Sequence, residues 1–512
     1  MFSVYNINIT LPPKRGKFKS RALIFFIFLE FSVLFEHEND TIAAICTGTG
    51  GAVGIIRISG PRALDAIRSV WRGRRMPGPD CPRIMLYGHI KSGPEGSGSG
   101  EPSLAVFMPG PHSFTGEDVA ELHCHGGSFA ARRALRLVLQ AGARLAQNGE
   151  FTRRAFLNGK LDLTQAEGVL DLINAGSERA GLLAERQLNG AVGSVVREIR
   201  AEVVRLLAEC ESRLDFSEED LDWMPPDALC GKITALREQA AALALTARAG
   251  SLIRDGVSLV IAGPPNAGKS SLLNRMLGYD RAIVTPVPGT TRDTLEESVS
   301  IGGIRFRVTD TAGLRETAEA DPVEALGMER SQKSLGAADI VLWLLDASAP
   351  AESFPAQFEA MRLAKSAVPG KFIPCWNKMD NAAMSPEGLD CAYSQEQNEG
   401  KSTNKSQHVF EHISARNGDG LDALFRRLEE TAWDGLPQAA QSGDAVVSER
   451  HAALLEQAAV HLEAACECVR AESWELAGSS LRTAAELIGC ITGETATPDV
   501  LDEIFSRFCI GK

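Results

Sequence analysis

The sequence lacks the features that mark several large classes of protein. Its 11 cysteines are odd in number and none forms a CxxC pair, which argues against a disulfide framework and a zinc ribbon and fits a reducing compartment. The closest clusters, His123-Cys124-His125 and Cys466-x-Cys468, offer too few ligands for a metal site. No apolar run reaches the roughly 20 residues that cross a bilayer, so we expect a cytoplasmic protein with no stable membrane association.

An excess of positive charge is also missing. The 512 residues include 53 Lys and Arg against 66 Asp and Glu, a formal net charge of −13. This balance excludes a uniformly basic nucleic-acid coat but leaves room for a local basic patch that docks RNA. Apolar residues make up 44% and charged residues 23% of the chain, which is typical of a globular protein and not of a disordered or collagen-like one.

Residues 1–38 differ from the rest of the chain. A basic segment, Lys14–Arg21, precedes an apolar stretch, Ala22–Phe35, and this order is typical of a signal peptide or membrane anchor. The stretch contains Glu30, is shorter than the ~20 residues of a membrane span and is followed by no small-residue cleavage site. We favour a second interpretation, a start codon assigned too far upstream. The extension is then non-native or disordered, and the globular chain starts near Asn39.

At roughly 150 residues per domain, the length suggests about three domains, or one domain split by an insertion. Short apolar runs at 41–45, 53–58 and 104–107 alternate with glycine-rich loops and predict a compact α+β domain over residues 39–160. The Gly/Ser/Pro-rich segment 92–102 predicts a mobile hairpin within it.

The remaining chain predicts a helical domain interrupted by an α/β domain. Apolar residues recur at helical spacing after Leu161, as in Val195, Ile199 and Val203, and again over 449–487. Between these regions lies an alternating βα pattern. We therefore expect helical parts at 161–255 and 437–512 and an inserted α/β domain at 256–436, within which the polar segment 385–408 is a surface loop.

The strongest motif lies at the start of the inserted domain. Gly263-Pro-Pro-Asn-Ala-Gly-Lys-Ser270 fits GxxxxGK[ST], follows the apolar run Val257–Ala262 and opens the helical segment Ser271–Leu277. This strand, loop and helix context is what a P-loop requires. We expect Lys269 to neutralise the β- and γ-phosphate oxygens and the Ser270 hydroxyl to ligate Mg²⁺.

Three later motifs follow in the order that GTPases require. Asp310-Thr311-Ala312-Gly313 ends the run 304–308, with Asp310 reaching Mg²⁺ through water and the Gly313 N–H facing the γ-phosphate. Asn377-Lys378-Met379-Asp380 follows the run 372–376, and the Asp380 carboxylate can accept from guanine N1 and N2, which selects GTP over ATP. Ser414-Ala415-Arg416 follows 409–413 and can hold guanine O6 with a backbone N–H.

Hydrolysis must use groups other than the usual glutamine. Leu314 follows Gly313, where Ras-like GTPases place the Gln that orients the attacking water. The carbonyl oxygen of Asn266 could ligate a monovalent cation beside the phosphates, or Asn266 could be a turn residue with no metal. Backbone carbonyls from the loop 285–291 could complete an oxygen shell for K⁺ where other GTPases place an arginine finger, and Thr291 is the expected switch threonine on Mg²⁺.

From about Asn39 to Lys512 the chain resembles the bacterial and organellar tRNA-modification GTPases of the MnmE/TrmE type. The strings that carry the resemblance are Gly51-Ala-Val-Gly-Ile-Ile-Arg-Ile-Ser-Gly60, Ser113-Phe-Thr-Gly-Glu-Asp118, Phe156-Leu-Asn-Gly-Lys-Leu-Asp-Leu163, Gly289-Thr-Thr-Arg-Asp293, Asp310-Thr-Ala-Gly-Leu-Arg-Glu316 and the terminal Phe508-Cys-Ile-Gly-Lys512. The last string, with a P-loop far upstream, is highly specific.

The resemblance implies the function and its cofactors. Such a protein works as a homodimer with an FAD-dependent partner of the MnmG/GidA type, in a heterotetramer or larger complex. It adds a carboxymethylaminomethyl-type group to C5 of the wobble uridine of certain tRNAs. The one-carbon unit comes from 5,10-methylenetetrahydrofolate or 5-formyltetrahydrofolate, bound by the N-terminal domain. GTP, Mg²⁺ and K⁺ bring the G domains together, which activates hydrolysis.

The resemblance also assigns residues. The folate contacts would be Arg57, Glu121, Lys160 and Lys512; the K⁺ shell would be Asn266, Thr285, Val287 and Thr290; the Mg²⁺ ligands would be Ser270 and Thr291. The catalytic residues would be Lys269, Asp310 and the switch glutamate Glu324, with Glu319 as the alternative because the preceding segment is longer than in the family. The remaining GTP contacts would be Ala267, Gly268, Ser271, Pro286, Pro288, Gly289, Thr311, Ala312, Lys378 and the guanine-loop residues above.

Two other functions share the G-domain motifs. A ribosome-assembly GTPase that switches RNA affinity is the main alternative, although such proteins usually carry an RNA-binding appendage instead of the N-terminal domain and terminal Cys-Ile-Gly-Lys seen here. A membrane iron-transport GTPase would need several apolar spans of ~20 residues, which the sequence lacks.

Overall fold

The computed structural model describes residues 40–48, 50–91, 100–215, 222–279, 297–310, 335–336, 338–368, 370–399, 410–434, 436 and 445–512. The chain divides into two compact units. The first contains the N-terminal region to Lys160 together with Phe505–Lys512, and the second contains Leu161–Ile504. The final residues of the chain therefore pack with the N-terminal unit, although the sequence grouped them with the second helical part.

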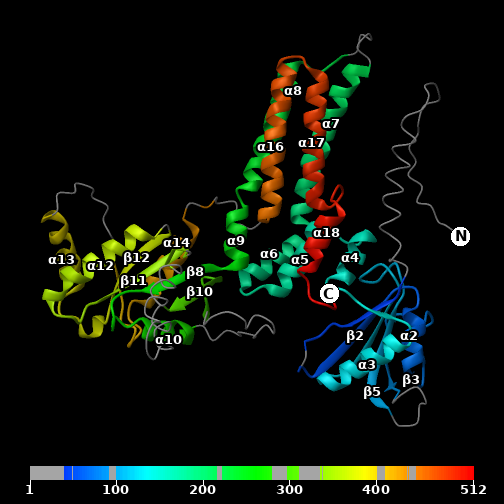
Figure 1. Cartoon of the computed structure of the whole chain (residues 1–512), viewed down its shortest axis with the longest axis horizontal. Coiled ribbons are helices and arrows are strands. Elements are labelled where there is room, and N and C mark those ends of the chain that lie inside the picture. Colours follow the sequence, from blue (N-terminus) through cyan, green and yellow to red (C-terminus); the bar gives the residue numbers. More distant parts are fainter. Residues whose placement is uncertain are drawn as a thin grey trace, which may run out of the picture. The chain divides into compact units, whose positions relative to one another are not determined.

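The N-terminal unit is built on a seven-stranded sheet of order β3-β4-β5-β6-β2-β1-β7. Its strands are β1 (Ile42–Ile45), β2 (Val53–Ser59), β3 (Trp71–Gly73), β4 (Leu86–Ile90), β5 (Glu101–Met108), β6 (Val119–His125) and β7 (Arg144–Leu145). Helices α2 (Ala63–Val70) and α3 (Ser128–Gln140) lie together over one face of the sheet (Figure 1). The three predicted strands of this region are all present.

Alternation along β2 divides its side chains between the two faces of that sheet. Ile56 and Ile58 are fully buried, and Gly54 comes so close to Ala131 of α3 that a Cβ would stand 3.2 Å from the alanine methyl group. These residues face the helices. Because successive side chains of a strand point to opposite faces, Ile55 and Arg57 face the other side, which α2 and α3 do not cover.

The end of the chain joins this unit beside α4 (Glu150–Leu157). Asn148 forms a bridge with Ile510, and the Phe151 N–H donates to the Lys512 carbonyl oxygen at 3.2 Å. Gly511 has φ +99°, and a Cβ there would lie 2.4 Å from the Ile45 carbonyl oxygen. Only glycine allows the tail to approach β1 this closely.

The α/β part of the second unit has a six-stranded sheet of order β13-β12-β11-β8-β10-β9. The strands are β8 (Val257–Ala262), β9 (Glu297–Ile301), β10 (Ile304–Asp310), β11 (Ile340–Asp346), β12 (Lys371–Asn377) and β13 (Glu411–His412). All pairings are parallel except that of β9 with β10, so the carboxyl ends of β8, β10, β11, β12 and β13 share one edge. Helices α10 (Lys269–Tyr279), α12 (Phe354–Ala367), α13 (Pro386–Glu399) and α14 (Leu421–Trp433) complete this part.

One expectation for this part was wrong. The segment 385–408 was predicted to be a loop, but α13 occupies Pro386–Glu399, while 400–409 lie outside the described residues. Leu389 and Tyr393 are one helical turn apart and buried, and the Tyr393 ring lies edge-on to Phe358 and Phe410 with centroids 5.0 Å away in each case. Two apolar residues at helical spacing were enough to anchor an otherwise polar helix.

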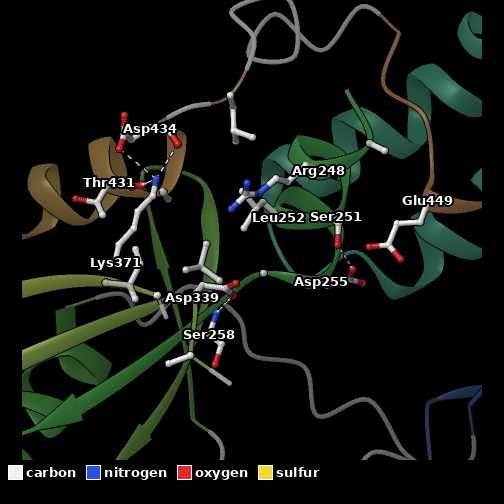
Figure 2. Close-up of a pocket in the computed structure, with 18 of the residues that line it drawn as sticks. Arg248, Ser251, Leu252, Asp255, Ser258, Asp339, Lys371, Thr431, Asp434 and Glu449 are labelled. Atoms are coloured by element: carbon white, nitrogen blue, oxygen red, sulfur yellow. Dashed lines mark hydrogen bonds and ion pairs between the residues drawn. The ribbon is translucent and has the colours of Figure 1, made fainter. Parts of the chain in front are cut away.

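A cleft of about 1520 Å³ lies at the amino ends of the strands (Figure 2). Its walls include Ser258 of β8, Lys371 of β12, and Arg248 and Asp255 of α9 (Ala247–Asp255). The Ser258 N–H donates to Asp339 Oδ2 at 2.8 Å, and Lys371 Nζ donates to the Thr431 carbonyl oxygen at 2.6 Å. The cleft is at the opposite end of the sheet from the P-loop.

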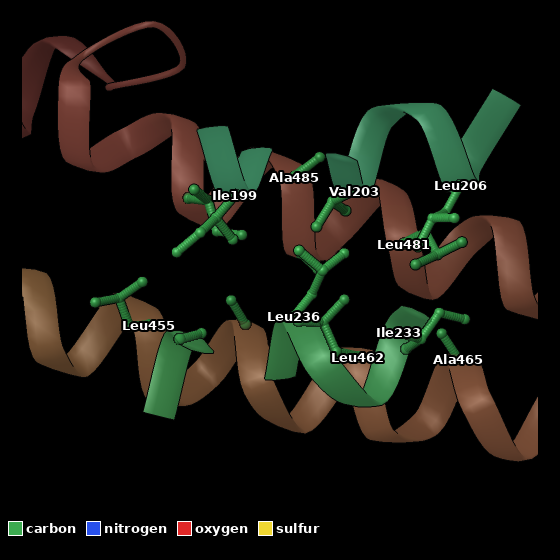
Figure 3. Close-up of a cluster of buried hydrophobic side chains, with 14 of the residues drawn as sticks. Ile199, Val203, Leu206, Ile233, Leu236, Leu455, Leu462, Ala465, Leu481 and Ala485 are labelled. Atoms are coloured by element: carbon green, nitrogen blue, oxygen red, sulfur yellow. The ribbon is translucent and has the colours of Figure 1, made fainter. Parts of the chain in front are cut away.

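The helical part of the second unit is centred on four long helices. They are α7 (Ala191–Asp215), α8 (Pro226–Ala244), α16 (Glu449–Arg470) and α17 (Trp474–Thr492). Their buried faces form one core in which Ile199 and Val203 meet Leu236, Leu455, Leu462 and Leu481 (Figure 3). Helices α5 (Leu163–Asn174), α6 (Glu178–Leu188) and α18 (Pro498–Ser506) are shorter. The chain enters the α/β part after α9 and returns before α16.

Candidate functional site

The P-loop connects β8 to α10. Gly263, Asn266 and Gly268 all have positive φ, of +145°, +63° and +92°. Asn266 is one of the residue types that tolerates the left-handed region without being glycine. The loop ends at Lys269, the first residue of α10, and the N-terminus of a helix favours an anion.

The predicted phosphate and Mg²⁺ contacts of the loop, Lys269 and Ser270, lie at the start of α10. Lys269 Nζ donates to the Gly263 carbonyl oxygen at 3.1 Å and to the Pro264 carbonyl oxygen at 2.9 Å, so the ammonium group is held across the loop. Ser270 and Ser271 are exposed in the first turn of α10. This places a lysine ammonium group and two hydroxyls at the N-terminus of α10, where phosphate binding was predicted.

Asn377 links the P-loop to the loop Ser414-Ala415-Arg416, which was predicted to bind guanine. It is buried at the end of β12, and its Nδ2 donates to the Ala267 carbonyl oxygen at 2.8 Å. Its Oδ1 accepts from the Ala415 N–H at 3.0 Å. One side chain therefore fixes the spacing between the phosphate loop and the Ser414-Ala415-Arg416 loop.

Asp380 lies exposed at the same edge and is oriented by Ser414. The Ser414 hydroxyl donates to Asp380 Oδ1 at 2.6 Å and accepts from the Asn417 N–H at 3.1 Å. The second carboxylate oxygen, Oδ2, forms no hydrogen bond among the described residues. A carboxylate held in this way can accept two N–H groups from one edge of a planar base. Arg416 is exposed beside it.

Lys378 is fixed by a residue that the sequence did not single out. Its backbone has φ +65°, and its Nζ donates to Asp346 Oδ2 at 2.7 Å. Burial raises the pKa of Asp346, but hydrogen bonds from Lys378 and Ser348 outweigh it and hold that pKa below its usual range. Asp346 could have been found from the sequence, because it directly follows the apolar run 340–345 and therefore ends a strand at the same edge of the sheet.

A second cluster lies in the N-terminal unit. Arg57 of β2 is directly opposite Glu121 of β6, and Arg57 Nε donates to Glu121 Oε1 at 2.8 Å. His123 Nε2 lies 3.2 Å from Glu121 Oε2. Burial raises the pKa of Glu121, but the bonds from His123 and Arg57 lower it overall, so the carboxylate is ionised at neutral pH.

Aromatic rings and the chain's end flank this pair. The Arg57 guanidinium lies 5.4 Å from the Phe114 ring centroid and 5.8 Å from that of Phe151. Burial raises the pKa of the nearby Cys46 thiol, and the charge of Arg57 opposes that shift. A Cβ at Gly511, the residue before Lys512, would lie 3.2 Å from the Cys46 Cα, so the backbone at the end of the chain reaches this part of the sheet. Lys160 Nζ instead donates to the Pro111 carbonyl oxygen at 3.1 Å, in the loop that carries Phe114.

Comparison with known proteins covers both clusters. A family model for the MnmE helical domain matches residues 163–509, and one for the GTP-binding protein TrmE N-terminus matches residues 41–160. The tRNA modification GTPase MnmE of Chloroflexus aurantiacus is 41% identical over 476 residues, which cover 93% of this chain and 100% of that protein. The protein of that name from Synechococcus sp. (strain JA-2-3B'a(2-13)) is 42% identical over 481 residues, covering 92% of this chain and 98% of that one.

The chain belongs to the MnmE family of tRNA modification GTPases. Among solved structures, this MnmE-family chain is similar to Era of Aquifex aeolicus bound to GDP.AlF4-, with 26% identity over 36% of this chain and 57% of that one, and a TM-score of 0.26. Within the part of the chain that the structure describes, no helix is long and apolar enough to cross a membrane. The same described residues include no group of three or more His, Cys, Asp or Glu side chains arranged to hold a metal ion.

Several residues predicted for this MnmE-family site lie outside the described residues. They are Thr285, Pro286, Val287, Pro288, Gly289, Thr290, Thr291, Thr311, Ala312, Gly313, Leu314 and both candidate glutamates, Glu319 and Glu324. Asp310 is the last residue of β10 and pairs with Ile261 of β8, next to the P-loop. The described geometry therefore covers the phosphate loop and the guanine-side loops.

Proposed function

We propose that this chain is a cytoplasmic GTPase that modifies the wobble uridine of certain tRNAs at C5, adding a carboxymethylaminomethyl-type group. The single observation that carries the proposal is the presence of two built sites in one chain. One is a P-loop tied by Asn377 to a guanine-side loop. The other is the Arg57–Glu121 pair, beside which the chain's own C-terminus is anchored.

The nucleotide site suits GTP and Mg²⁺. The N–H groups of the loop around Gly268 would cradle the phosphates, Lys269 would leave its loop carbonyls to meet phosphate oxygens, and the exposed Ser270 hydroxyl would ligate Mg²⁺ with Thr291. Asp380 would accept from guanine N1 and N2. Asp310, at the end of the neighbouring strand, would reach Mg²⁺ through water.

Potassium would supply the positive charge that an arginine finger supplies elsewhere. Asn266 is exposed at the apex of the loop in a left-handed conformation, so its side-chain oxygen can join an oxygen shell beside the phosphates. Thr285, Val287 and Thr290 would complete that shell, and Glu324 would position the attacking water. Hydrolysis would follow when two G domains of a homodimer meet.

The N-terminal site suits a reduced folate. A pterin ring carries donors that pair with the Glu121 carboxylate, and its face can lie against the rings that flank Arg57. Arg57, Lys160 and Lys512 supply positive charge for the anionic glutamate tail. When bound, 5,10-methylenetetrahydrofolate or 5-formyltetrahydrofolate would supply the one-carbon unit. An FAD-dependent partner of the MnmG/GidA type would supply the redox chemistry.

The deciding experiment is a nucleoside mass analysis of total tRNA from cells that lack this gene, with and without a complementing copy. We expect the C5-modified wobble uridine to disappear and to return with the gene. Complementation by an Asp380→Asn copy should fail, because this variant is expected to bind GTP more weakly. Unchanged uridines together with misassembled ribosomal subunits would overturn the proposal in favour of a ribosome-assembly GTPase.

A further inference from the structure

The two parts of the chain carry opposite charge. Residues 40–160 contain 15 Lys and Arg against nine Asp and Glu, whereas residues 161–512 contain 33 against 54. Of the 15 basic residues, 13 are arginine. A net acidic protein therefore has one net basic domain, and the arrangement of its charges indicates where a polyanion would bind.

The solvent face of α3 is basic and carries an exposed aromatic ring. Ala131, Ala134 and Val138 are buried against the sheet, while Phe129, Arg132 and Arg136 recur at helical spacing on the outside. The Phe129 side chain is 77% exposed. The helix contains no acidic residue, and neither Arg132 nor Arg136 forms an ion pair with any residue that the structure describes.

Helix α2 continues this basic face. Arg62, the residue before the helix, and Arg68, in its last turn, are exposed, with the exposed acid Asp65 between them. Lys91 joins the two helices, because its Nζ donates to the Ser69 carbonyl oxygen at 2.5 Å and its own carbonyl oxygen accepts from Arg133 Nη2 at 3.4 Å.

Neighbouring interactions position the edges of this face. Arg68 Nε donates to the Pro77 carbonyl oxygen at 2.8 Å, which holds the guanidinium at the end of α2. The nearby acid Asp80 is engaged by Arg75 at 3.3 Å. Arg132 and Arg136, by contrast, are exposed and have no such partner among the described residues, so their charge is available to a partner.

We propose that this surface, formed by Arg62, Arg68, Lys91, Phe129, Arg132 and Arg136, binds the phosphodiester backbone of tRNA, with Phe129 stacking on an unpaired base. The inference rests on the proposed function, which supplies tRNA as the substrate, and assigns a place where the tRNA is held. Guanidinium groups match phosphate oxygens in pairs, and an exposed ring among them gives a stacking platform.

The surface is separate from the site of chemistry. Gly54 faces α3, whereas Arg57, three residues later on β2, faces the other side of the sheet. The arginine-rich helices therefore contact a part of the tRNA away from the reacting uridine. A membrane is a poorer match, because an interfacial helix needs a continuous apolar face, and here one ring stands among cations.

The test is equilibrium binding of the full chain to an unmodified tRNA transcript that has uridine at the wobble position. Binding is measured between about 50 and 200 mM salt, because the dependence of affinity on salt over this range reports the number of phosphate contacts. We expect the double variant Arg132→Gln/Arg136→Gln to bind on the order of tenfold more weakly and to reduce the salt slope by about one to two. Phe129→Ala should weaken binding with an unchanged slope. Arg132→Lys/Arg136→Lys should restore the slope.

The matched control is Arg205→Gln/Arg482→Gln, which removes two exposed arginines from α7 and α17 of the second unit. It should bind tRNA like the unaltered chain, and all variants should hydrolyse GTP normally, which reports correct folding. If the Arg132/Arg136 variant binds tRNA as tightly as the unaltered chain, the inference is overturned but the proposed function is not. Tighter Arg132-dependent binding to phosphatidylglycerol vesicles than to tRNA would also overturn it. Absence of both tRNA binding and wobble modification by the unaltered chain would instead defeat the proposed function.

Discussion

At the scale of single residues, Gly268 shows how closely the nucleotide site is built. Its φ of +92° is in the range that favours glycine, and a Cβ there would stand 2.3 Å from Asn377 Nδ2. We expect Gly268→Ala to displace Asn377 and weaken GTP binding by about tenfold or more. Affinity for a fluorescent GTP analogue measures this.

Gly278, in the last turn of α10, provides the matched control. A Cβ at that position meets nothing within 4 Å, so Gly278→Ala should leave GTP affinity unchanged and slightly stabilise the helix. Equal affinities for the two variants would contradict the bridging role of Asn377.

Base selection also depends on a single residue, Asp380. The Ser414 hydroxyl fixes one oxygen of Asp380, so the other oxygen is directed by the same geometry. Replacing Asp380 with Asn exchanges an acceptor for a donor, which suits xanthine better than guanine. We expect Asp380→Asn to lower GTP affinity by about 10- to 100-fold and to raise affinity for xanthosine triphosphate, in competition binding assays. Unaltered preference for GTP would remove Asp380 from base recognition.

At the scale of elements, the sequence predicted strands and helices well where the run of apolar residues was long. The run Val257–Ala262 is β8 with the same bounds, and the predicted strand 372–376 lies within β12. Within the predicted strand 409–413, the structure has the shorter β13, Glu411–His412, whose two residues pair with Cys375 and Trp376 of β12, while residue 409 lies outside the described residues. Helix α13 was missed because its burial depends on Phe358 and Phe410, which are distant in sequence and reach it only in the fold.

The site was predictable to the extent that motifs record local geometry. The P-loop and the guanine-side motifs fall where their spacing placed them, on the carboxyl ends of parallel strands. The tertiary contacts were not predictable. Nothing in the sequence shows that Asn377 bonds to both Ala267 and Ala415, or that Arg57 and Glu121 are cross-strand partners, since pairing register is set by the folded sheet.

A buried ionic cluster joins three helices near the return from the α/β part. His451 is fully buried at the start of α16, and its Nε2 lies 2.7 Å from Glu167 Oε2 of α5. Arg450 Nε donates to Glu167 Oε1 at 2.8 Å, and its Nη2 donates to the Ile491 carbonyl oxygen of α17. Burial raises the pKa of Glu167, but His451 and Arg450 reverse that shift and lower the pKa to about 2. Burial lowers the pKa of His451 more than Glu167 raises it.

This cluster predicts acid sensitivity. Because the folded pKa of His451 is below its unfolded value of about 6.5, stability from this group is complete above that pH and is lost as the pH falls below it. The free energy of unfolding should therefore fall between pH 7.5 and 5.5 (about the window that spans the unfolded pKa), by at most about 1.4 kcal/mol per pH unit. Denaturant unfolding followed by tryptophan fluorescence measures the slope. His451→Gln should flatten it, and parallel slopes would argue against a neutral buried histidine.

At the scale of the whole molecule, the proposed dependence on potassium is a property of two chains. If K⁺ beside Asn266 completes the charge at an interface shared by two chains, the rate of GTP hydrolysis per chain should rise with protein concentration in KCl. Replacement by NaCl should lower the rate on the order of 10²-fold, the usual effect of losing one preorganised charge-stabilising group. Steady-state phosphate release across a concentration series tests both points. Equal rates in the two salts would exclude the cation from catalysis.

The end of the chain packs within the N-terminal unit that holds the Arg57–Glu121 pair. Lys512 lies beside α4, where the Phe151 N–H donates to its backbone oxygen, and the neighbouring Gly511 packs closely against Ile45 of β1, the strand that pairs with β2. Replacing Lys512 with Ala removes the side-chain ammonium group but keeps the backbone oxygen that accepts from Phe151. We expect Lys512→Ala to weaken binding of 5-formyltetrahydrofolate by about tenfold, as loss of one charge-assisted contact does, with GTP affinity unchanged. Titration calorimetry with each ligand separates the two effects.

Lys232→Ala, an exposed lysine of α8, serves as the control and should alter neither affinity. Folate binding that survives the Lys512 change would separate the tail from the N-terminal site, since the tail would then have only a structural role there.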